Sequence, residues 1–168
     1  MIKISFIGPE SSGKSTLSLM LSKHLKCKLV TEYAREYLKG KTKYSENDLK
    51  KIAEEQSRRL NNAKKKGKHF LVADTCLIDI EIWSEVKFKT LHTEIKKMSE
   101  EENFEIYFLC KPDIPWKEDP LRENPNNRDL LYNKFKEKLS NKKINYFIVK
   151  GNLKDRFSFC LDIISRNK

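Results

Sequence analysis

Short apolar runs alternate along this chain with longer segments in which apolar residues recur at every third or fourth position. Short runs rich in β-branched residues predict strands, and the longer spacing predicts helices with one buried face. The predicted strands are Ile2–Ile7, Lys28–Thr31, Phe70–Ala73, Phe104–Cys110 and Tyr146–Val149. Two of these runs, Phe70–Ala73 and Phe104–Cys110, are continuous and apolar, which is typical of parallel strands buried on both faces.

Helical spacing follows each predicted strand. The segments that carry it are Leu17–Leu25, Glu32–Leu38, Ser45–Gly67, Ile78–Met98, Leu130–Leu139 and Phe157–Ile164. In the third segment Ser45 is a candidate N-cap, with Asp48 three residues later, and Gly67 is the expected end. The pattern in Ile78–Met98 is interrupted near Val86–Phe88, so two helices are predicted there.

The alternation of strands and helices predicts the fold class. Strands separated by helices pair in parallel, and the crossovers between them are right-handed. We therefore expect a three-layer, doubly wound α/β domain with a parallel sheet of five strands, spanning residues 1–168 as a single domain. The charged, proline-rich stretch at 111–128 fits no regular element and is expected to form a lid-like loop.

Composition narrows the class of protein. The 168 residues are 38% hydrophobic and 35% charged, which suits one domain with a single core. No window approaches the roughly 20 apolar residues of a membrane span, and the N-terminal residues lack a signal-peptide pattern. We therefore expect a cytoplasmic protein with no membrane partner. The four cysteines form no C-x-x-C pair, which favours reduced thiols.

The net charge of +11 suits a partner that carries phosphate groups, either a nucleotide or a nucleic acid. Of the 35 basic residues, 28 are Lys and 7 are Arg. The lysines are scattered along the chain without interleaved aromatic residues, which argues against nucleic acid. A nucleotide is the ligand that the charge favours.

One motif indicates specific chemistry. The run Gly8–Ser15 satisfies G-x-x-x-x-G-K-[ST] and lies between the first predicted strand and the first predicted helix, as in P-loop enzymes. Its glycines let backbone N–H groups surround phosphate oxygens at a helix start. Lys14 is expected to bridge the β and γ phosphates of ATP, and Ser15 to bind Mg²⁺. The predicted nucleotide-binding residues are Gly8, Glu10, Ser11, Ser12, Gly13, Lys14, Ser15 and Thr16.

Asp74 is the second candidate ligand for Mg²⁺ or for its water shell. It follows the buried run Phe70–Ala73, and a carboxylate at the end of a strand beside the phosphate loop suits that role. An N-cap for the next helix is the alternative. The chain lacks the N-K-x-D signature of guanine recognition and is too short for a motor ATPase. With those two classes excluded, we expect a compact enzyme that transfers phosphate from ATP to a small acceptor.

The acceptor is expected beyond the end of the second strand, beside the phosphate loop. Glu32, Tyr33 and Arg35 follow that strand directly. A carboxylate there could orient or deprotonate an acceptor hydroxyl, so Glu32 is a candidate base.

The predicted loop at 111–128 supplies further candidates. Arg122 and Arg128 are expected to contact the transferring phosphate. Trp116 either stacks on a flat acceptor ring or anchors the loop to the core. The predicted catalytic residues are Lys14, Glu32, Asp74, Arg122 and Arg128.

Four segments in this order resemble a known family. Gly8–Leu17, Glu32–Tyr37, Ala73–Thr75 and Asp113–Trp116 are together similar to the ribosylnicotinamide kinase domain of the bifunctional NadR proteins. The resemblance implies ATP-dependent phosphorylation of the 5′-hydroxyl of nicotinamide riboside, which gives nicotinamide mononucleotide for NAD salvage. The NadR adenylyltransferase domain is missing, so only the phosphorylation step is expected.

The same resemblance implies roles for individual residues. Glu32, Tyr33 and Arg35 would face the riboside, Asp74 would face the hydroxyl or the metal, and Trp116 would face the nicotinamide ring. After Thr75 the chain has Cys76 where the family often has an acidic residue, and it lacks the threonines that follow.

Two alternatives remain open. The first keeps the enzyme class and changes the acceptor to another nucleoside or a vitamin alcohol. The second is an ATP-binding module whose nucleotide state controls a partner protein or nucleic acid, which only the net charge of +11 supports.

Overall fold

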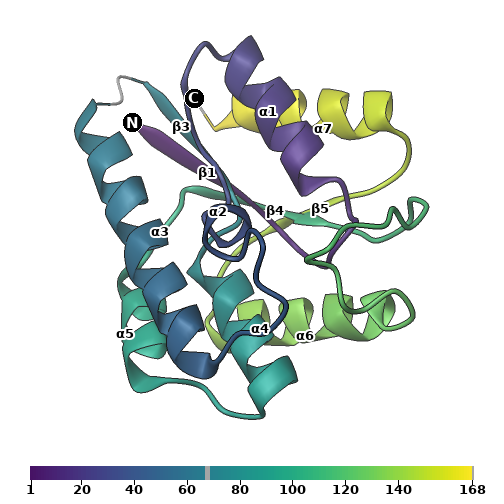
Figure 1. Cartoon of the computed structure of the whole chain (residues 1–168). Helices are drawn as coiled ribbons and strands as arrows, with labels where there is room; N and C mark the ends of the chain where they lie inside the picture. The colour runs from purple at the N-terminus through teal and green to yellow at the C-terminus, as the bar shows by residue number, and fades with distance from the viewer. Residues whose placement is uncertain (67–68, 168) are drawn as a thin grey trace.

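The computed structural model describes residues 1–66 and 69–167 as a five-stranded sheet with helices on both faces (Figure 1). The strands are β1 (Ile2–Ile7), β2 (Lys28–Val30), β3 (Phe70–Asp74), β4 (Ile106–Cys110) and β5 (Phe147–Val149). Their order across the sheet is β2-β3-β1-β4-β5, and each neighbouring pair is parallel. This confirms the predicted three-layer, doubly wound α/β fold.

Helices connect the strands and form the two outer layers. They are α1 (Lys14–His24), α2 (Ala34–Tyr37), α3 (Glu46–Lys66), α4 (Leu77–Phe88), α5 (Thr93–Glu101), α6 (Arg128–Asn141) and α7 (Leu153–Arg166). In Figure 1, α1 and α7 lie together on one side of the sheet, and α3, α4 and α6 lie on the other. Among the described residues no helix combines the length and the apolar character that crossing a membrane requires.

The two faces of β1 explain the layering. Ile4 and Phe6 pack with α1 and α7, whereas Ile7 packs with α3, α4 and α6 on the opposite face. Because successive side chains of a strand point to opposite faces, a central strand must be apolar on both. The buried positions of α3 recur with helical spacing, as predicted, at Leu49, Ile52, Ala53, Leu60 and Ala63.

The start of α3 agrees with the sequence. The backbone N–H of Asp48 donates to the Ser45 hydroxyl at 3.3 Å, and the Ser45 N–H donates to the Asp48 carboxylate at 2.8 Å. These reciprocal bonds satisfy N–H groups that have no partner within the helix. The predicted end of this helix at Gly67 lies outside the described residues.

One helix prediction needs correction, and another is confirmed. The segment Glu32–Leu38 forms only the single turn α2, so Glu32 and Tyr33 precede the helix. The two helices predicted within Ile78–Met98 are α4 and α5, and the break between them begins just after Phe88, at Lys89, whose φ of 59° is left-handed. A left-handed residue ends the run of i to i−4 bonds, which the apolar spacing does not reveal.

Two further boundaries differ from the prediction. Strand β4 begins at Ile106, after Phe104, although Phe104 is buried in the core. The stretch 111–127 contains no helix or strand, as expected, but Arg128 is the first residue of α6. We call residues 111–127 the β4–α6 loop.

Candidate active site

A cavity lies at the carboxyl ends of the parallel strands, where doubly wound sheets bind ligands. Its wall includes the phosphate loop (Gly8–Ser15), Glu32 and Arg35 after β2, and side chains of α3, α4 and the β4–α6 loop. Of the residues predicted from sequence, those that line it are Gly8, Glu10, Ser11, Ser12, Gly13, Lys14, Ser15, Thr16, Glu32, Arg35 and Arg122.

Glycine is required at two points of the phosphate loop. Gly8 has a φ of 134°, and a Cβ there would lie 2.7 Å from the carbonyl oxygen of Cys110 in β4. Gly13, the N-cap of α1, has a φ of 88°. Side-chain-bearing residues rarely adopt such angles. The glycine spacing of the motif therefore sets the path by which the chain turns from β1 into α1.

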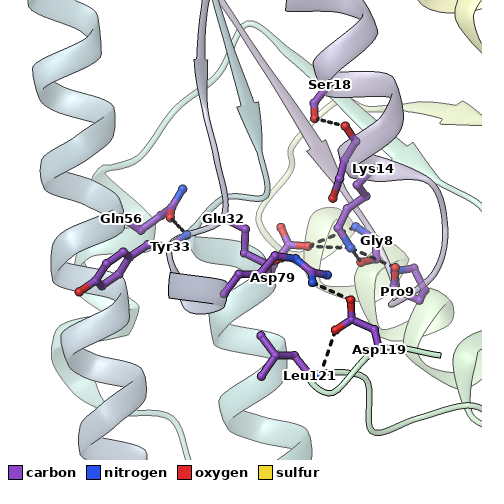
Figure 2. A network of polar contacts seen from close by, with 12 residues as sticks. Gly8, Pro9, Lys14, Ser18, Glu32, Tyr33, Gln56, Asp79, Asp119 and Leu121 are labelled. Carbon is purple, nitrogen blue, oxygen red and sulfur yellow. Dashed lines mark hydrogen bonds and ion pairs between the residues drawn. The ribbon is translucent and has the colours of Figure 1, made fainter. Parts of the chain in front are cut away.

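Lys14 begins α1 and points back across the loop. Its ammonium group donates to the carbonyl oxygens of Gly8 at 2.5 Å and Pro9 at 3.0 Å, and it lies 3.9 Å from a carboxylate oxygen of Asp79 (Figure 2). The Lys14 ammonium group is thus held beside the N-terminus of α1, where anions are favoured.

Three carboxyl groups surround Lys14, each from a different part of the sheet edge. Glu32 follows β2, Asp74 ends β3, and Asp79 lies in the first turn of α4. Burial raises the pKa of all three, and Lys14 partly opposes the rise in each. For Asp79 burial raises the pKa to about 7. The protonation of these carboxyl groups therefore depends on whether the Lys14 ammonium group stays near them.

Asp74 fits a role in binding a metal ion. Its Oδ1 is buried and has no hydrogen-bond partner among the described residues. The Ser15 hydroxyl lies beside this carboxylate and lowers its pKa. Mg²⁺ prefers oxygen ligands and commonly keeps several waters while binding one or two carboxylates and a phosphate. Asp74 and Ser15 match that requirement. The alternative role of Asp74 as an N-cap does not apply, because Asp74 is the last residue of β3 and Cys76 is the N-cap of α4.

The β4–α6 loop is docked on the phosphate loop. Glu10 accepts hydrogen bonds from the backbone N–H groups of Glu123 at 3.0 Å and Asn124 at 2.9 Å. The backbone N–H of Lys117 donates to the Ser11 hydroxyl at 2.9 Å. Side chains of the phosphate motif thus bind the loop backbone, which the motif pattern alone does not indicate.

The two loop arginines occupy different positions. Arg122 lines the cavity, and its guanidinium donates to the carbonyl of Lys117. The Arg128 guanidinium donates to the carbonyls of Ser11 at 3.2 Å and Ile114 at 2.9 Å, and Arg128 is not among the lining residues. Arg128 therefore joins the phosphate loop to the β4–α6 loop, and of these two arginines it is Arg122 that lines the cavity.

Three predicted substrate residues, Tyr33, Asp74 and Trp116, are also not among the residues that line the cavity. The Trp116 indole N–H donates to Glu118 at 2.9 Å, and the Trp116 ring centre lies 5.7 Å from the Arg128 guanidinium. The Tyr33 ring points toward α3, where the Arg59 guanidinium lies 4.3 Å from its centre (Figure 2). Neither aromatic ring lines the cavity.

Two lining residues of α4 were missed as site residues. Asp79 and Trp83 lie four residues apart and so share one face of the helix. Trp83 donates from its indole N–H to the Tyr44 hydroxyl at 2.8 Å. The signal was available in the sequence, because α4 begins only a short turn after Asp74, which places its first residues beside the phosphate loop.

Arg35 connects the end of β2 to the loop. Its Nε donates to Glu32 at 2.9 Å, and its Nη1 donates to Asp119 at 2.8 Å. Arg35 thus bonds to both Glu32 and Asp119, and Figure 2 shows these two carboxylates in one view with Asp79 and Lys14. The arrangement brings together an anion-binding loop, a lysine, carboxyl groups and a covering loop.

Comparison with known proteins agrees with this geometry. The family model described as an AAA domain, AAA_28, matches residues 3–156. The trifunctional NAD biosynthesis/regulator protein NadR of Salmonella typhimurium is 25% identical over 96% of this chain and 41% of the relative. The chain thus spans less than half the length of that curated relative.

Solved structures show the same fold. A NadR protein in complex with NAD and AMP-PNP gives a TM-score of 0.83 at 16% identity, over 98% of this chain and 49% of that chain. A NadR protein in complex with NR gives a TM-score of 0.82 at 17% identity, over 98% of this chain and 51% of that chain. Deoxyadenosine kinase from M. mycoides gives a TM-score of 0.67 at 16% identity, over 98% of this chain and 100% of that chain. The fold is that of a P-loop kinase.

Proposed function

This chain belongs to the AAA domain family AAA_28, and on that premise we propose that it is an ATP-dependent kinase of nicotinamide riboside. The reaction would give nicotinamide mononucleotide and ADP. One observation carries the proposal: Lys14 of the phosphate loop and Glu32 after β2 line the same cavity, so a phosphate donor and a hydroxyl acceptor can meet there.

The phosphate loop supplies the donor site. Backbone N–H groups at the start of α1 would bind the phosphates of ATP, and the Lys14 ammonium would move from the loop carbonyls to the β and γ phosphates. Asp74 and Ser15 would hold Mg²⁺ beside them. Bound there, the ion would neutralise part of the negative charge of the phosphates.

Glu32 supplies the acceptor chemistry. The acceptor hydroxyl oxygen would attack the γ phosphorus, the bond to the oxygen that bridges to the β phosphorus would break, and the hydroxyl proton would pass to the Glu32 carboxylate. Burial raises the pKa of Glu32, which makes its carboxylate a stronger base than an exposed one. Arg35 orients that carboxylate through its 2.9 Å hydrogen bond.

The β4–α6 loop would act as a lid. Its contacts with Glu10 and Ser11 keep it over the phosphate loop, where it would exclude water from the transferring group. Arg122 lines the cavity from this loop and could contact that group as a positive charge.

The acceptor assignment rests on two supports. NadR proteins are similar to this chain in sequence and fold, and one was solved in complex with NR. The cavity wall also combines an aromatic face, Trp83, with the carboxyl groups of Glu32 and Asp79. The nicotinamide ring of the riboside is flat and positively charged, and such a ring is attracted both to an indole face and to carboxylates.

A second candidate acceptor is a deoxynucleoside. The likeness to deoxyadenosine kinase from M. mycoides covers 98% of this chain and 100% of that one, whereas the NadR structures are covered by about half. The uncharged base of a deoxynucleoside would stack on Trp83 and would not need the negative charges of Glu32 and Asp79.

The test is ATP consumption with Mg²⁺, first without acceptor and then with nicotinamide riboside, deoxyadenosine and thiamine, with products identified by mass. We expect nicotinamide riboside to increase ATP consumption strongly and to be converted to its monophosphate. Phosphorylation of deoxyadenosine alone would select the second candidate. Slow hydrolysis that no acceptor changes would contradict both and would favour a nucleotide-controlled module.

A further inference from the structure

Asp79 holds a position that the phosphate-transfer step proposed above does not use. One carboxylate oxygen accepts a hydrogen bond from the backbone N–H of Gly8 at 3.3 Å and lies 3.9 Å from the Lys14 ammonium. The other accepts from the N–H of Cys76 at 3.1 Å. A single side chain thus joins the first residue of the phosphate loop, the start of α4 and the lysine of the motif.

The Asp79–Lys14 contact is well shielded from water. Only 12% of the Asp79 side chain and 14% of the Lys14 side chain are exposed. Electrostatic attraction at such a distance is several times stronger there than in bulk water. The Asp79 carboxylate therefore balances the positive charge of the Lys14 ammonium group. The phosphates of an incoming nucleotide would compete with Asp79 for that ammonium group.

We propose that Asp79 is the counter-anion which nucleotide phosphates displace from Lys14, and that its carboxyl takes up a proton from water as the nucleotide binds. The proposal rests on the proposed function, because it requires that ATP bind at the phosphate loop. It makes Asp79 a positioning residue, which sets where Lys14 lies before the phosphates arrive.

The surroundings of Asp79 favour that proton uptake. The ionisable groups that face it are Lys14 of α1, Glu32 after β2, Glu102 before β4, and the thiols of Cys76 and Cys110. Lys14 is the cation of this set and lowers the pKa of Asp79. When Lys14 turns to the phosphates, that support is lost and further negative charge arrives nearby. Both changes favour the protonated carboxyl.

The carboxyl begins near the midpoint of its titration, because burial raises the pKa of Asp79 to about 7. At neutral pH about half of the molecules would therefore need to take up a proton, and at pH 8 nearly all would. Uptake on binding means that affinity falls as pH rises. We expect the Kd for ATP to increase about fivefold between pH 7 and pH 8.

The experiment is calorimetric titration of the protein with ATP and Mg²⁺ at pH 8, in several buffers of different ionisation enthalpy. The dependence of the heat on the buffer gives the number of protons taken up per nucleotide. These conditions lie above the second pKa of a phosphate group, about 6, so the phosphates contribute little. We expect nearly one proton per ATP for the wild-type protein.

Two variants separate Asp79 from its neighbours. Asp79→Asn should bind ATP without proton uptake and with a Kd that no longer changes between pH 7 and pH 8. Glu102→Gln is the matched control, because burial also raises the pKa of Glu102 to about 7 although it makes no contact with Lys14. It should keep the proton uptake of the wild-type protein. Thermal unfolding verifies that each variant is folded.

The outcomes are distinguishable. No ATP binding by the wild-type protein would contradict the proposed function and this inference with it. ATP binding without proton uptake at pH 8 would overturn the inference alone, and so would uptake that persists in Asp79→Asn. The wild-type measurement decides the matter even if the Asp79 variant does not fold.

Discussion

The guanidinium of Arg156, in the last helix, donates a 2.7 Å hydrogen bond to the carbonyl oxygen of Ser12 in the phosphate loop. The same group donates to the carbonyls of Gly151 at 2.7 Å and Lys111 at 2.9 Å and pairs with Asp113. Arg156 is 2% exposed. One buried side chain therefore fixes the phosphate loop to the ends of β4 and β5.

Replacing Arg156 by Met should strongly destabilise the fold. The change removes the Arg156 donor from three carbonyls and from the Asp113 carboxylate, which keeps its hydrogen bond from the Gly151 N–H. Removing one partner of a buried ion pair costs about 3–5 kcal/mol. Urea unfolding followed by circular dichroism measures the loss. Arg166→Ala is the control, because Arg166 pairs with Asp162 at the exposed end of the same helix and should change stability by less than about 0.5 kcal/mol. Equal losses in the two variants would contradict the assigned role of Arg156.

Gly8→Ala should also destabilise the protein, for a backbone reason. The added Cβ would meet the Cys110 carbonyl at 2.7 Å while φ is 134°, so β1 and β4 would have to separate locally. We expect a loss of about 2–3 kcal/mol or more. Gly40→Ala is matched, since φ there is 78° but no atom lies within 4 Å of the new Cβ. It should cost only the left-handed strain of about 1–2 kcal/mol. Thermal unfolding of the two variants tests the difference.

Lys14→Ala should remove activity without unfolding the protein. Among residues 1–66 and 69–167, the Lys14 ammonium donates hydrogen bonds to carbonyls of its own loop and lies beside Asp79, so the core does not depend on it. Loss of a charge placed on the transferring phosphate costs about a hundredfold or more in turnover. Lys23→Ala, an exposed position on the same helix, should keep wild-type activity. Steady-state kinetics with circular dichroism tests this, and full activity of Lys14→Ala would rule out the phosphate-loop mechanism.

The sheet and the phosphate loop were predictable because their signals are local. Apolar runs marked every strand, and the fixed glycine spacing marked the turn from β1 into α1. The two helices within Ile78–Met98 were also predicted, but the exact end of α4 was not, because a left-handed Lys89 ends that helix and no apolar spacing encodes it. Local patterns therefore fixed the elements more reliably than their ends.

The walls of the cavity were harder to predict because they depend on packing between distant segments. Trp116 was expected either to stack on the acceptor ring or to anchor the loop, and its contacts lie within its own loop and with Arg128. Trp83 lines the cavity instead, on the same face of α4 as Asp79. Which of two tryptophans reaches a site depends on how a helix is rotated against the sheet, and composition carries no such information.

Asp119→Asn should weaken acceptor binding modestly. The carboxylate of Asp119 accepts a 2.8 Å hydrogen bond from Arg35, which also orients Glu32. Because the Arg35 side chain is 40% exposed, such a pair contributes at most about 1 kcal/mol, so we expect the KM for the acceptor to rise by no more than about fivefold. The KM for ATP should change less. Asp162→Asn removes a surface pair far along α7 and should change neither value. A larger effect on ATP than on the acceptor would contradict this coupling.

The last prediction concerns Glu102 and the pH dependence of stability. Its carboxylate accepts a 2.8 Å hydrogen bond from the N–H of Leu77, and burial raises its pKa to about 7. The folded state therefore binds this proton more tightly than the unfolded state does. The stabilisation is complete below the unfolded pKa of about 4.3 and is lost as pH rises through about 7.

Glu102→Gln replaces this carboxyl with a group that stays neutral at all pH values. Its stability relative to the wild-type protein should therefore increase between pH 5 and pH 7 and level off above pH 8. Urea unfolding at pH 5, 6, 7 and 8 gives the difference. The Asp79 carboxyl group, whose charge also raises the pKa of Glu102, is present in both proteins. Glu100→Gln, an exposed neighbour on α5, should show no such trend. A stability difference between Glu102→Gln and the wild type that does not vary with pH would show that Glu102 is ionised in the fold at every pH tested.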